Sequence, residues 1–307
     1  MENITPWIIL ITYVLALLLI DFFILHKKNR DTSVRRAIFE TIFFIVNALI
    51  FSGFIYWFYD TSLVDNVNNL EPAQAVVKYL TGYIIELSLS VDNLFVIAII
   101  FTSFKIPRQY QHNLLFLGIL GAIIFRAILI SVGLILINKI HGMNIVFGLF
   151  LLFTAIKMLK KEAEHKEVKE PKGIIKLFRF SNELHDGKYI TKVNRKTVFT
   201  TLFGALITIE LTDLLFALDS IPAIFAVTTD PFIVFSSNIF AVMGLRSLYF
   251  FLSNMLEKFV YLKYSVFAIL LFVSLKLMTA SLIEIPEWFS LLFIGISLLS
   301  GIYISTI

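Results

Sequence analysis

Five carboxylates lie in two otherwise apolar stretches of the chain. Glu86 and Asp92 fall in GYIIELSLSVDNLFVIAIIF, and Glu210, Asp213 and Asp219 fall in ALITIELTDLLFALDSIPAIFAV. An ionised side chain at the centre of a membrane helix costs about 2.5–3.5 kcal/mol on insertion scales, and such residues usually mark an ion pathway or a binding site. Clustered carboxylate oxygens are ligands for a hard cation. The two stretches therefore predict a cation site.

Other polar groups in these stretches fit the same chemistry. Helical spacing puts Glu86, Ser90 and Asn93 near one face, and Asp213 shares a face with Ser220. With no cysteine in the chain and no histidine in either stretch, the available ligands are oxygens, which favour Mg²⁺, Ca²⁺ or Mn²⁺ over Zn²⁺ or Cu⁺. Because carboxylates also take up protons, exchange of metal against protons suits such a site. The predicted metal ligands are Glu86, Asp92, Asn93, Glu210, Asp213, Asp219 and Ser220.

A proline follows the second group of acids. Asp213 and Asp219 are six residues apart, so a straight helix points them in different directions. Pro222, in DSIPA, removes a backbone hydrogen bond and frees a carbonyl near residue 218. We expect a helix break that brings the two carboxylates together beside that carbonyl, as in the broken helices of transporters.

Four basic residues also lie in apolar segments, and ion pairing with the acids is the alternative role for both sets. We expect Arg126, Arg246 and Lys276 to supply counter-charge, while Lys157 lies close enough to a segment end to extend its ammonium to the membrane surface. The acids outnumber these bases, so pairing alone does not account for all of them. Asp21, at the end of the first apolar segment, has two open interpretations: a shallow residue facing the headgroups, or a member of the site.

The composition is that of a polytopic membrane protein. The 307 residues are 58% hydrophobic, include 32 Phe and have a mean hydropathy of +0.87, whereas soluble domains are nearer half apolar. The net charge of +4 does not imply a nucleic-acid partner, because the basic residues lie in the loops. An enzyme is not expected, since the chain has no cysteine, no histidine at membrane depth and no H-E-x-x-H motif. No cofactor is expected either.

Nine segments are long and apolar enough to span a bilayer, which takes about 20 residues. We therefore predict an all-α fold in which residues 1–307 form a single transmembrane domain. The loops after the first, third, fifth and seventh segments carry nearly all the loop Lys and Arg, which predicts an outside N-terminus and a cytoplasmic C-terminus. Residues 160–197 form the long cytoplasmic loop, which turns amphipathic at GIIKLFRF, as an interfacial helix would. The nine segments are 7–25, 38–58, 79–101, 114–137, 143–159, 200–227, 233–252, 260–283 and 288–306.

The third to eighth segments read as two copies of one three-helix unit, approximately 79–159 and 200–283. A shift of about 127 residues superimposes Glu86-x5-Asp92-Asn93 on Asp213-x5-Asp219-Ser220. In each copy a segment with one buried arginine follows, and then a segment with one lysine. Three is an odd number of spans, so the copies would cross the membrane in opposite senses. Such inverted repeats bind substrate near the midplane, at the interface between the copies.

The stretches ELSLSVDNLFVIAIIF and ELTDLLFALDSIPAIFAVTTDPFIVFSSNIFAVMGLRSLYF resemble the TerC/Alx family of bacterial integral membrane proteins. The resemblance implies a multi-pass protein of the bacterial inner membrane. The family is named for tellurite resistance, and several members are implicated in manganese efflux and in manganese supply to secreted metalloproteins. Tellurite is an anion and suits an acidic site poorly, so the resemblance implies metal handling.

These observations lead to three hypotheses. The first is a transporter that exports Mn²⁺ from the cytoplasm by proton exchange, with metal ion and protons as substrates and the lipid bilayer as its environment. The second is a membrane scaffold that delivers metal or recruits partners in tellurite or metal stress through residues 160–197. The third is a Ca²⁺/H⁺ exchanger. Acids at membrane depth favour transport, because a scaffold needs no buried charge; protein partners are not identified by the sequence.

Overall fold

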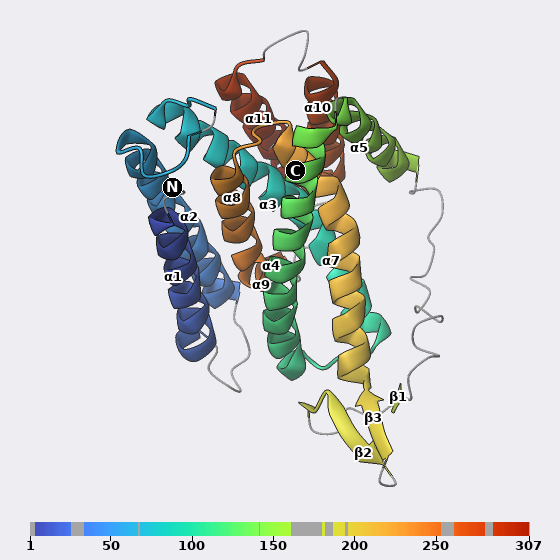
Figure 1. The fold of residues 1–307 in the computed structure, drawn as a ribbon. Coiled ribbons are helices and arrows are strands. Elements are labelled where there is room, and N and C mark those ends of the chain that lie inside the picture. Colours follow the sequence, from blue (N-terminus) through green and yellow to red (C-terminus); the bar gives the residue numbers. More distant parts are fainter. Residues whose placement is uncertain are drawn as a thin grey trace.

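The computed structural model of the chain describes residues 4–25, 34–66, 68–140, 142–160, 180–181, 187–193, 196–252, 261–279 and 285–306. Within these ranges the protein is a bundle of helices with one small sheet (Figure 1). Every predicted apolar segment coincides with helical residues. The helices are α1 (Thr5–Ile20) with the π-helical turn η1 (Asp21–Leu25), α2 (Val34–Asp60), α3 (Pro72–Ser103), α4 (Arg108–Lys139), α5 (Met143–Lys160), α7 (Thr201–Phe225), α8 (Pro231–Met243), α9 (Leu245–Leu252), α10 (Leu262–Thr279) and α11 (Glu287–Thr306).

Six helical segments of the described chain are long and apolar enough to cross a membrane. The apolar parts of α5 and α10 are shorter, covering Met143–Ile156 and Tyr264–Thr279. The chain is thus a helical protein with several candidate membrane spans, and nine crossings stay a prediction. The six segments are Thr5–Phe23, Arg35–Asp60, Arg108–Lys139, Thr201–Phe225, Pro231–Phe251 and Trp288–Ser305.

The α8–α9 segment lies at the centre of the bundle. Its span Pro231–Phe251 is 83% buried inside the protein, whereas the other five candidate spans are at most 33% buried. α3 packs against α2, α7, α8 and α11, α4 packs against α7 and α8, and α5 packs against α10. The outward faces of the remaining spans are apolar, as expected for surfaces that meet lipid rather than protein.

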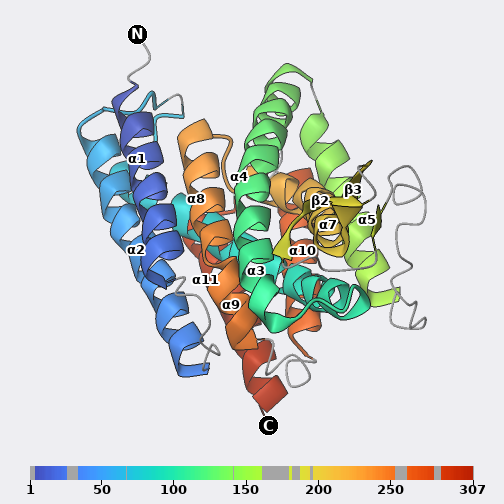
Figure 2. The same ribbon diagram turned by 90° about the horizontal axis from the view of Figure 1, so that it is seen from below.

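α1 and α2 form a hairpin along one side of the bundle, opposite the side that holds α5 and α10 (Figures 1 and 2). Aromatic rings join this hairpin to α8. Trp7 meets Phe232 edge to face with ring centroids 5.2 Å apart, and Phe51 lies 4.6 Å from Phe240. Such pairs add about 0.5–1.5 kcal/mol each beyond simple burial.

A three-stranded sheet projects from one end of the bundle (Figure 1). β3 (Lys196–Thr200) pairs antiparallel with β2 (Ile190–Val193) and parallel with β1 (Phe180–Ser181), and it runs directly into α7. No strands were predicted here from the sequence, although the β-branched run KTVFT favours one. The interfacial helix expected at GIIKLFRF falls on residues outside the described ranges, except for Phe180, which begins β1.

The predicted break in the second acidic helix does not occur. α7 continues from Thr201 through Pro222 to Phe225, and the N–H of Ala226 still bonds to the Pro222 carbonyl at 3.2 Å. Pro222 lies in the last turn, so the single hydrogen bond that it removes is lost close to the natural end of the helix. Asp213 and Asp219 are therefore presented by one continuous helix.

Candidate functional site

Arg126 of α4 is the centre of a buried charge cluster. The residue is 1% exposed, and its guanidinium binds the Asp213 carboxylate through two bonds, Nε to Oδ2 at 3.1 Å and Nη2 to Oδ1 at 2.9 Å. Its Nη1 forms an ion pair with the fully buried Glu86 carboxylate. One cation thus holds carboxylates from α3 and α7, which are far apart in the sequence. A two-bond arginine–carboxylate contact fixes geometry as well as charge.

Asn238 of α8 completes this cluster. Its Nδ2 donates to Glu86 Oε2 at 3.0 Å, and its Oδ1 accepts from Arg126 Nη1 at 3.5 Å. Ser90, one turn after Glu86 on α3, donates to Glu86 Oε1 at 3.1 Å. Four helices therefore supply the cluster, which consists of Glu86, Ser90, Arg126, Asp213 and Asn238.

The cluster lies near the middle of the helices that build it. Asp213 is the central residue of α7, and Glu86 and Arg126 lie within one turn of the centres of α3 and α4. Helices of this length are comparable to the thickness of a bilayer at 1.5 Å per residue. The charges are therefore far from both helix ends. At that depth in a membrane an ionised group is costly unless it is paired.

Glycines of α4 allow α7 to approach closely. A side chain at Gly121 would collide with the Glu210 carboxylate, and one at Gly118 would press on Ile209. Small residues at a helix contact permit such close packing inside membranes. Glu210 Oε2 is buried and has no hydrogen-bond partner among the described residues. Glu210 thus presents a carboxylate oxygen available to a ligand or a proton, one turn before Asp213.

Asp219 points elsewhere. It accepts a hydrogen bond from Thr154 of α5 at 3.0 Å, so it faces a different helix from Asp213.

Ser220 and Asn93 are both buried, and within the described ranges the Ser220 hydroxyl has no hydrogen-bond partner. The backbone of Asp92 belongs to α3, but its side chain lies outside the description, as does that of Lys157. The structure therefore brings Glu86, Asp213 and Arg126 together, and it directs Asp219 away from them.

Arg246 of α9 pairs with a different set of acids. Its Nη2 forms an ion pair with Asp21, at the start of η1, and lies 3.8 Å from Glu40 Oε2 of α2. Glu40 also accepts from Arg36 Nε at 2.9 Å. Asp21 and Glu40 are each 2% exposed, so Asp21 is buried rather than facing the headgroups. This second cluster fastens the α1–α2 hairpin to the centre of the bundle.

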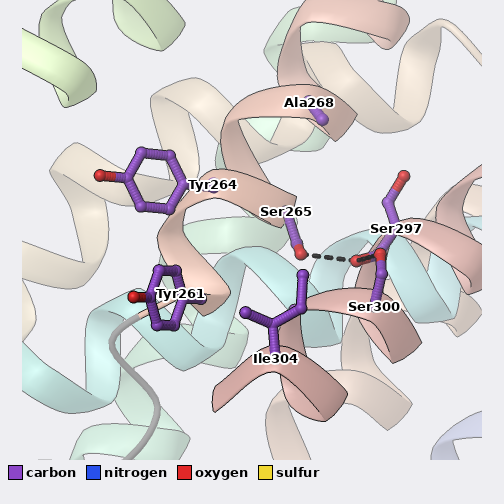
Figure 3. A pocket seen from close by; sticks show the side chains of 8 residues that line it. Tyr261, Tyr264, Ser265, Ala268, Ser297, Ser300 and Ile304 are labelled. Carbon is purple, nitrogen blue, oxygen red and sulfur yellow. Dashed lines mark hydrogen bonds between the residues drawn. The ribbon is translucent and has the colours of Figure 1, made fainter. Parts of the chain in front are cut away.

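Lys276 of α10, the third predicted counter-charge, donates to Ser290 of α11 at 3.0 Å. Near the C-terminal end of α11 a groove of about 470 Å³ opens between the same two helices (Figure 3). Its lining is made of tyrosines, serines and small apolar residues, and the Ser265 hydroxyl donates to the Ser297 carbonyl at 2.5 Å. No acidic side chain lines this groove in the described chain, so it is separate from the charge cluster.

No three Asp, Glu or His side chains in the described chain gather as a closed metal site would require. The two carboxylates of the central cluster face a guanidinium instead. Glu86, Asp213 and Arg126 were predicted from the sequence, whereas Asn238 and Glu40 were not. An asparagine in an apolar segment needs a polar partner, and that was the only signal for Asn238.

Comparison of the sequence with known proteins finds one matching family. The sequence family described as "Integral membrane protein TerC family" matches residues 71–307. An uncharacterized membrane protein of Rickettsia felis is 42% identical over 98% of this chain and 97% of its own length. A protein of Salmonella typhi that carries the name membrane-bound redox modulator Alx is 37% identical over 91% of this chain and 86% of its own. No solved structure matches the chain.

Proposed function

The chain belongs to the TerC family of integral membrane proteins, and we propose that it transports a divalent metal cation, Mn²⁺ in the first place, across the bacterial inner membrane in exchange for protons. The carboxylates of Glu86 and Asp213 would be the primary ligands. One observation carries this proposal: acids from two helices that are far apart in the sequence converge on a single positive charge in the interior of the bundle. Ionised groups at such a position in a membrane protein usually serve a transport pathway.

We infer that the substrate cation competes with Arg126 for the two carboxylates. Glu86 and Asp213 carry two negative charges against one on the guanidinium, so the cluster without a metal has one uncompensated negative charge. A divalent ion bound between the carboxylates would neutralise both and release the guanidinium. Asn238 can offer an amide oxygen as a further ligand, and carboxylate and amide oxygens suit Mn²⁺, Ca²⁺ or Mg²⁺.

Glu210 is the candidate proton carrier. Its buried oxygen without a described hydrogen-bond partner lies one turn before Asp213 on the same helix. Uptake of a proton there as the metal leaves would replace one of the two positive charges that the divalent ion carries away, which limits the charge imbalance of the empty site. Asp219, hydrogen-bonded to Thr154, would then belong to the approach to the central site, and Asp92 stays a predicted ligand.

The helix packing supports an inverted repeat as the mechanical basis. An inverted repeat would exchange α3 with α7, α4 with α8 and α5 with α10. This exchange converts the α4–α7 contact into the α8–α3 contact and leaves the α5–α10 contact unchanged, and all three contacts are present. A two-fold axis between the copies would produce this set of pairs. Glu86 and Asp213, which the 127-residue shift superimposes, also share one arginine. Rocking of one copy against the other would expose the site alternately to the two sides.

Transport by the purified protein in liposomes tests this proposal. Flux of Mn²⁺, Ca²⁺ and Mg²⁺ is followed across an imposed pH gradient for the wild type, Glu86→Gln and Asp213→Asn. Asp60→Asn is the matched control, because Asp60 is an exposed acid at the end of α2. We expect metal flux in the wild type and the control, and its loss in the two site variants, which keep the side-chain shape without the charge. Equal flux in all four proteins, or none in the wild type, refutes the assignment.

The scaffold hypothesis makes a different prediction about the cytoplasmic loop. Deletion of residues 161–195 leaves flux largely unchanged if the protein is a transporter. If that loop recruits partners, the deletion instead abolishes the resistance of cells to tellurite or metal stress. The name of the Alx relatives suggests a redox role, and this chain has no cysteine for thiol chemistry of its own. A preference for Ca²⁺ over Mn²⁺ in the flux assay would favour the Ca²⁺/H⁺ exchanger.

A further inference from the structure

A third group of buried polar residues lies at the end of the bundle remote from the sheet. α7 begins at β3 and ends at Phe225, so the corner between α7 and α8 is at the opposite end (Figure 1). There the Lys78 ammonium of α3 donates to the backbone carbonyl of Val227 at 3.0 Å. This contact, which we call the clasp, joins the two acid-bearing helices outside the candidate spans. Asp230, the N-cap of α8, lies near Lys78.

Asp230 has one oxygen engaged and one not. The residue is 1% exposed; its Oδ1 accepts from the Ile233 N–H at 3.2 Å, while its Oδ2 is buried without a hydrogen-bond partner in the described chain. The Tyr59 hydroxyl of α2 lies beside it and is likewise buried and, within the same ranges, unbonded. The two groups are close enough to influence each other's charge but do not meet hydrogen-bond geometry. A buried polar atom left unpaired typically costs about 1–3 kcal/mol.

A proton on Asp230 would remove the charge from its buried Oδ2. A small approach of the two side chains would then let the new O–H donate to the Tyr59 oxygen, whereas in the ionised form the Tyr59 hydroxyl is the donor. Burial raises the pKa of the Asp230 carboxyl, and this rise is opposed by the Tyr59 hydroxyl, the N–H groups of Ile233 and Phe232, and the Lys78 ammonium. These are the polar and charged groups that face Asp230 from α2, α3 and α8 in the described chain.

We propose that Asp230 is a proton-binding site that controls the clasp between α3 and α7. Ionised Asp230 attracts Lys78 and keeps it close to the Val227 carbonyl. Protonated Asp230 no longer does so, and the ends of α3 and α7 become free to separate. This proposal concerns the end of the bundle and stands whether or not the central cluster binds a metal, so its test contains no transport measurement.

Infrared difference spectroscopy of the purified protein between high and low pH detects a buried carboxyl directly. The chain has 22 Asp and Glu residues, so the Asp230 band is the part of the protonated-carboxyl absorption that is lost in Asp230→Asn; we expect this part to remain in Asp60→Asn, which replaces an exposed acid at the same end. Lys78→Met removes a charge that lowers the pKa of Asp230, so the midpoint of this band should move to higher pH. A protonated-carboxyl absorption that is the same in Asp230→Asn as in the wild type, or a midpoint that moves to lower pH in Lys78→Met, overturns the proposal.

The clasp itself is measured as a distance. The chain contains no cysteine, so spin labels placed at Ala73→Cys on α3 and Thr229→Cys in the α7–α8 corner report only on these two ends. We expect a narrow distribution of distances at high pH and a longer, broader one below the midpoint of the infrared band. Lys78→Met should give the broad distribution at every pH. A distribution that does not change with pH, or that stays narrow in Lys78→Met, contradicts control of the clasp by Asp230.

Discussion

Replacing Arg126 with methionine should destabilise the protein more than neutralising either of its acidic partners. Arg126→Met leaves the carboxylates of Glu86, which is fully buried, and Asp213, whose side chain is 14% exposed, without their counter-charge. Removing one partner from a buried ion pair costs about 3–5 kcal/mol. Glu86→Gln, by contrast, leaves a neutral Arg126–Asp213 pair and weakens one charged hydrogen bond, a loss of about 1.5–3 kcal/mol.

The same logic predicts that the loss can be repaired. A triple variant that combines Arg126→Met with Glu86→Gln and Asp213→Asn has no charge left in the cluster, so it should regain most of the lost stability. The three changes are in mutual contact, and their effects are therefore not additive. The free energy of unfolding is measured by reversible denaturant titration in detergent micelles. Equal stability of the wild type and Arg126→Met, or a triple variant as unstable as the single one, would show that the ion-pair cluster is not what holds these helices.

Added metal extends the test to the proposed function. If a cation competes with the guanidinium, Mn²⁺ should stabilise Arg126→Met more than the wild type, because the variant offers both carboxylates. Metal at 100 times its dissociation constant contributes about 2.7 kcal/mol of stabilisation to the state that binds it. A variant that gains no more from Mn²⁺ than the wild type does would refute competition at this position.

Two further substitutions test the packing around the cluster by the same titration. Asn238→Leu removes the donor to Glu86 Oε2, and we expect a loss of about 1.5–3 kcal/mol, since the acceptor is a buried carboxylate; an unchanged free energy would contradict this bond. Gly133→Ala places a methyl group 2.6 Å from the buried Phe225 ring and should cost about 1–3 kcal/mol. Gly53→Ala, where a methyl group meets nothing within 4 Å, should instead be neutral or stabilising by up to about 1 kcal/mol, and equal losses for the two glycines would exclude packing as the cause.

Hydropathy was sufficient to predict where the helices lie. Each of the nine apolar segments overlaps helical residues of the described chain, because burying backbone in lipid forces the chain to satisfy its own hydrogen bonds. The α8–α9 segment was predicted equally well, yet its central position was not predicted, because a lipid-facing helix and a protein-enclosed helix are both apolar. The sheet at 180–200 was missed since its strands are short and depend on pairing between distant residues.

The candidate site was predicted only in part. Glu86, Asp213 and Arg126 were expected from their charge at depth, and the structure brings them together. The proline-driven convergence of Asp213 with Asp219 was wrong, because the helix stays continuous. Glu40 lies close to arginines at the start of α2 and reads as a surface residue, so its burial against Arg246 depends on a contact across the fold that no local pattern reveals.

The ion pair between Asp21 and Arg246 joins residues 225 positions apart, and this separation affects biosynthesis. A ribosome that adds about 5–20 residues per second needs roughly 10–45 s to reach Arg246 after it has made Asp21. During that interval the first two helices are already synthesised; Glu40 has Arg36 on its own helix as a partner, but Asp21 still awaits Arg246. The nascent hairpin must therefore keep Asp21 protonated or hydrated, or remain beside the insertion machinery, until α9 is synthesised.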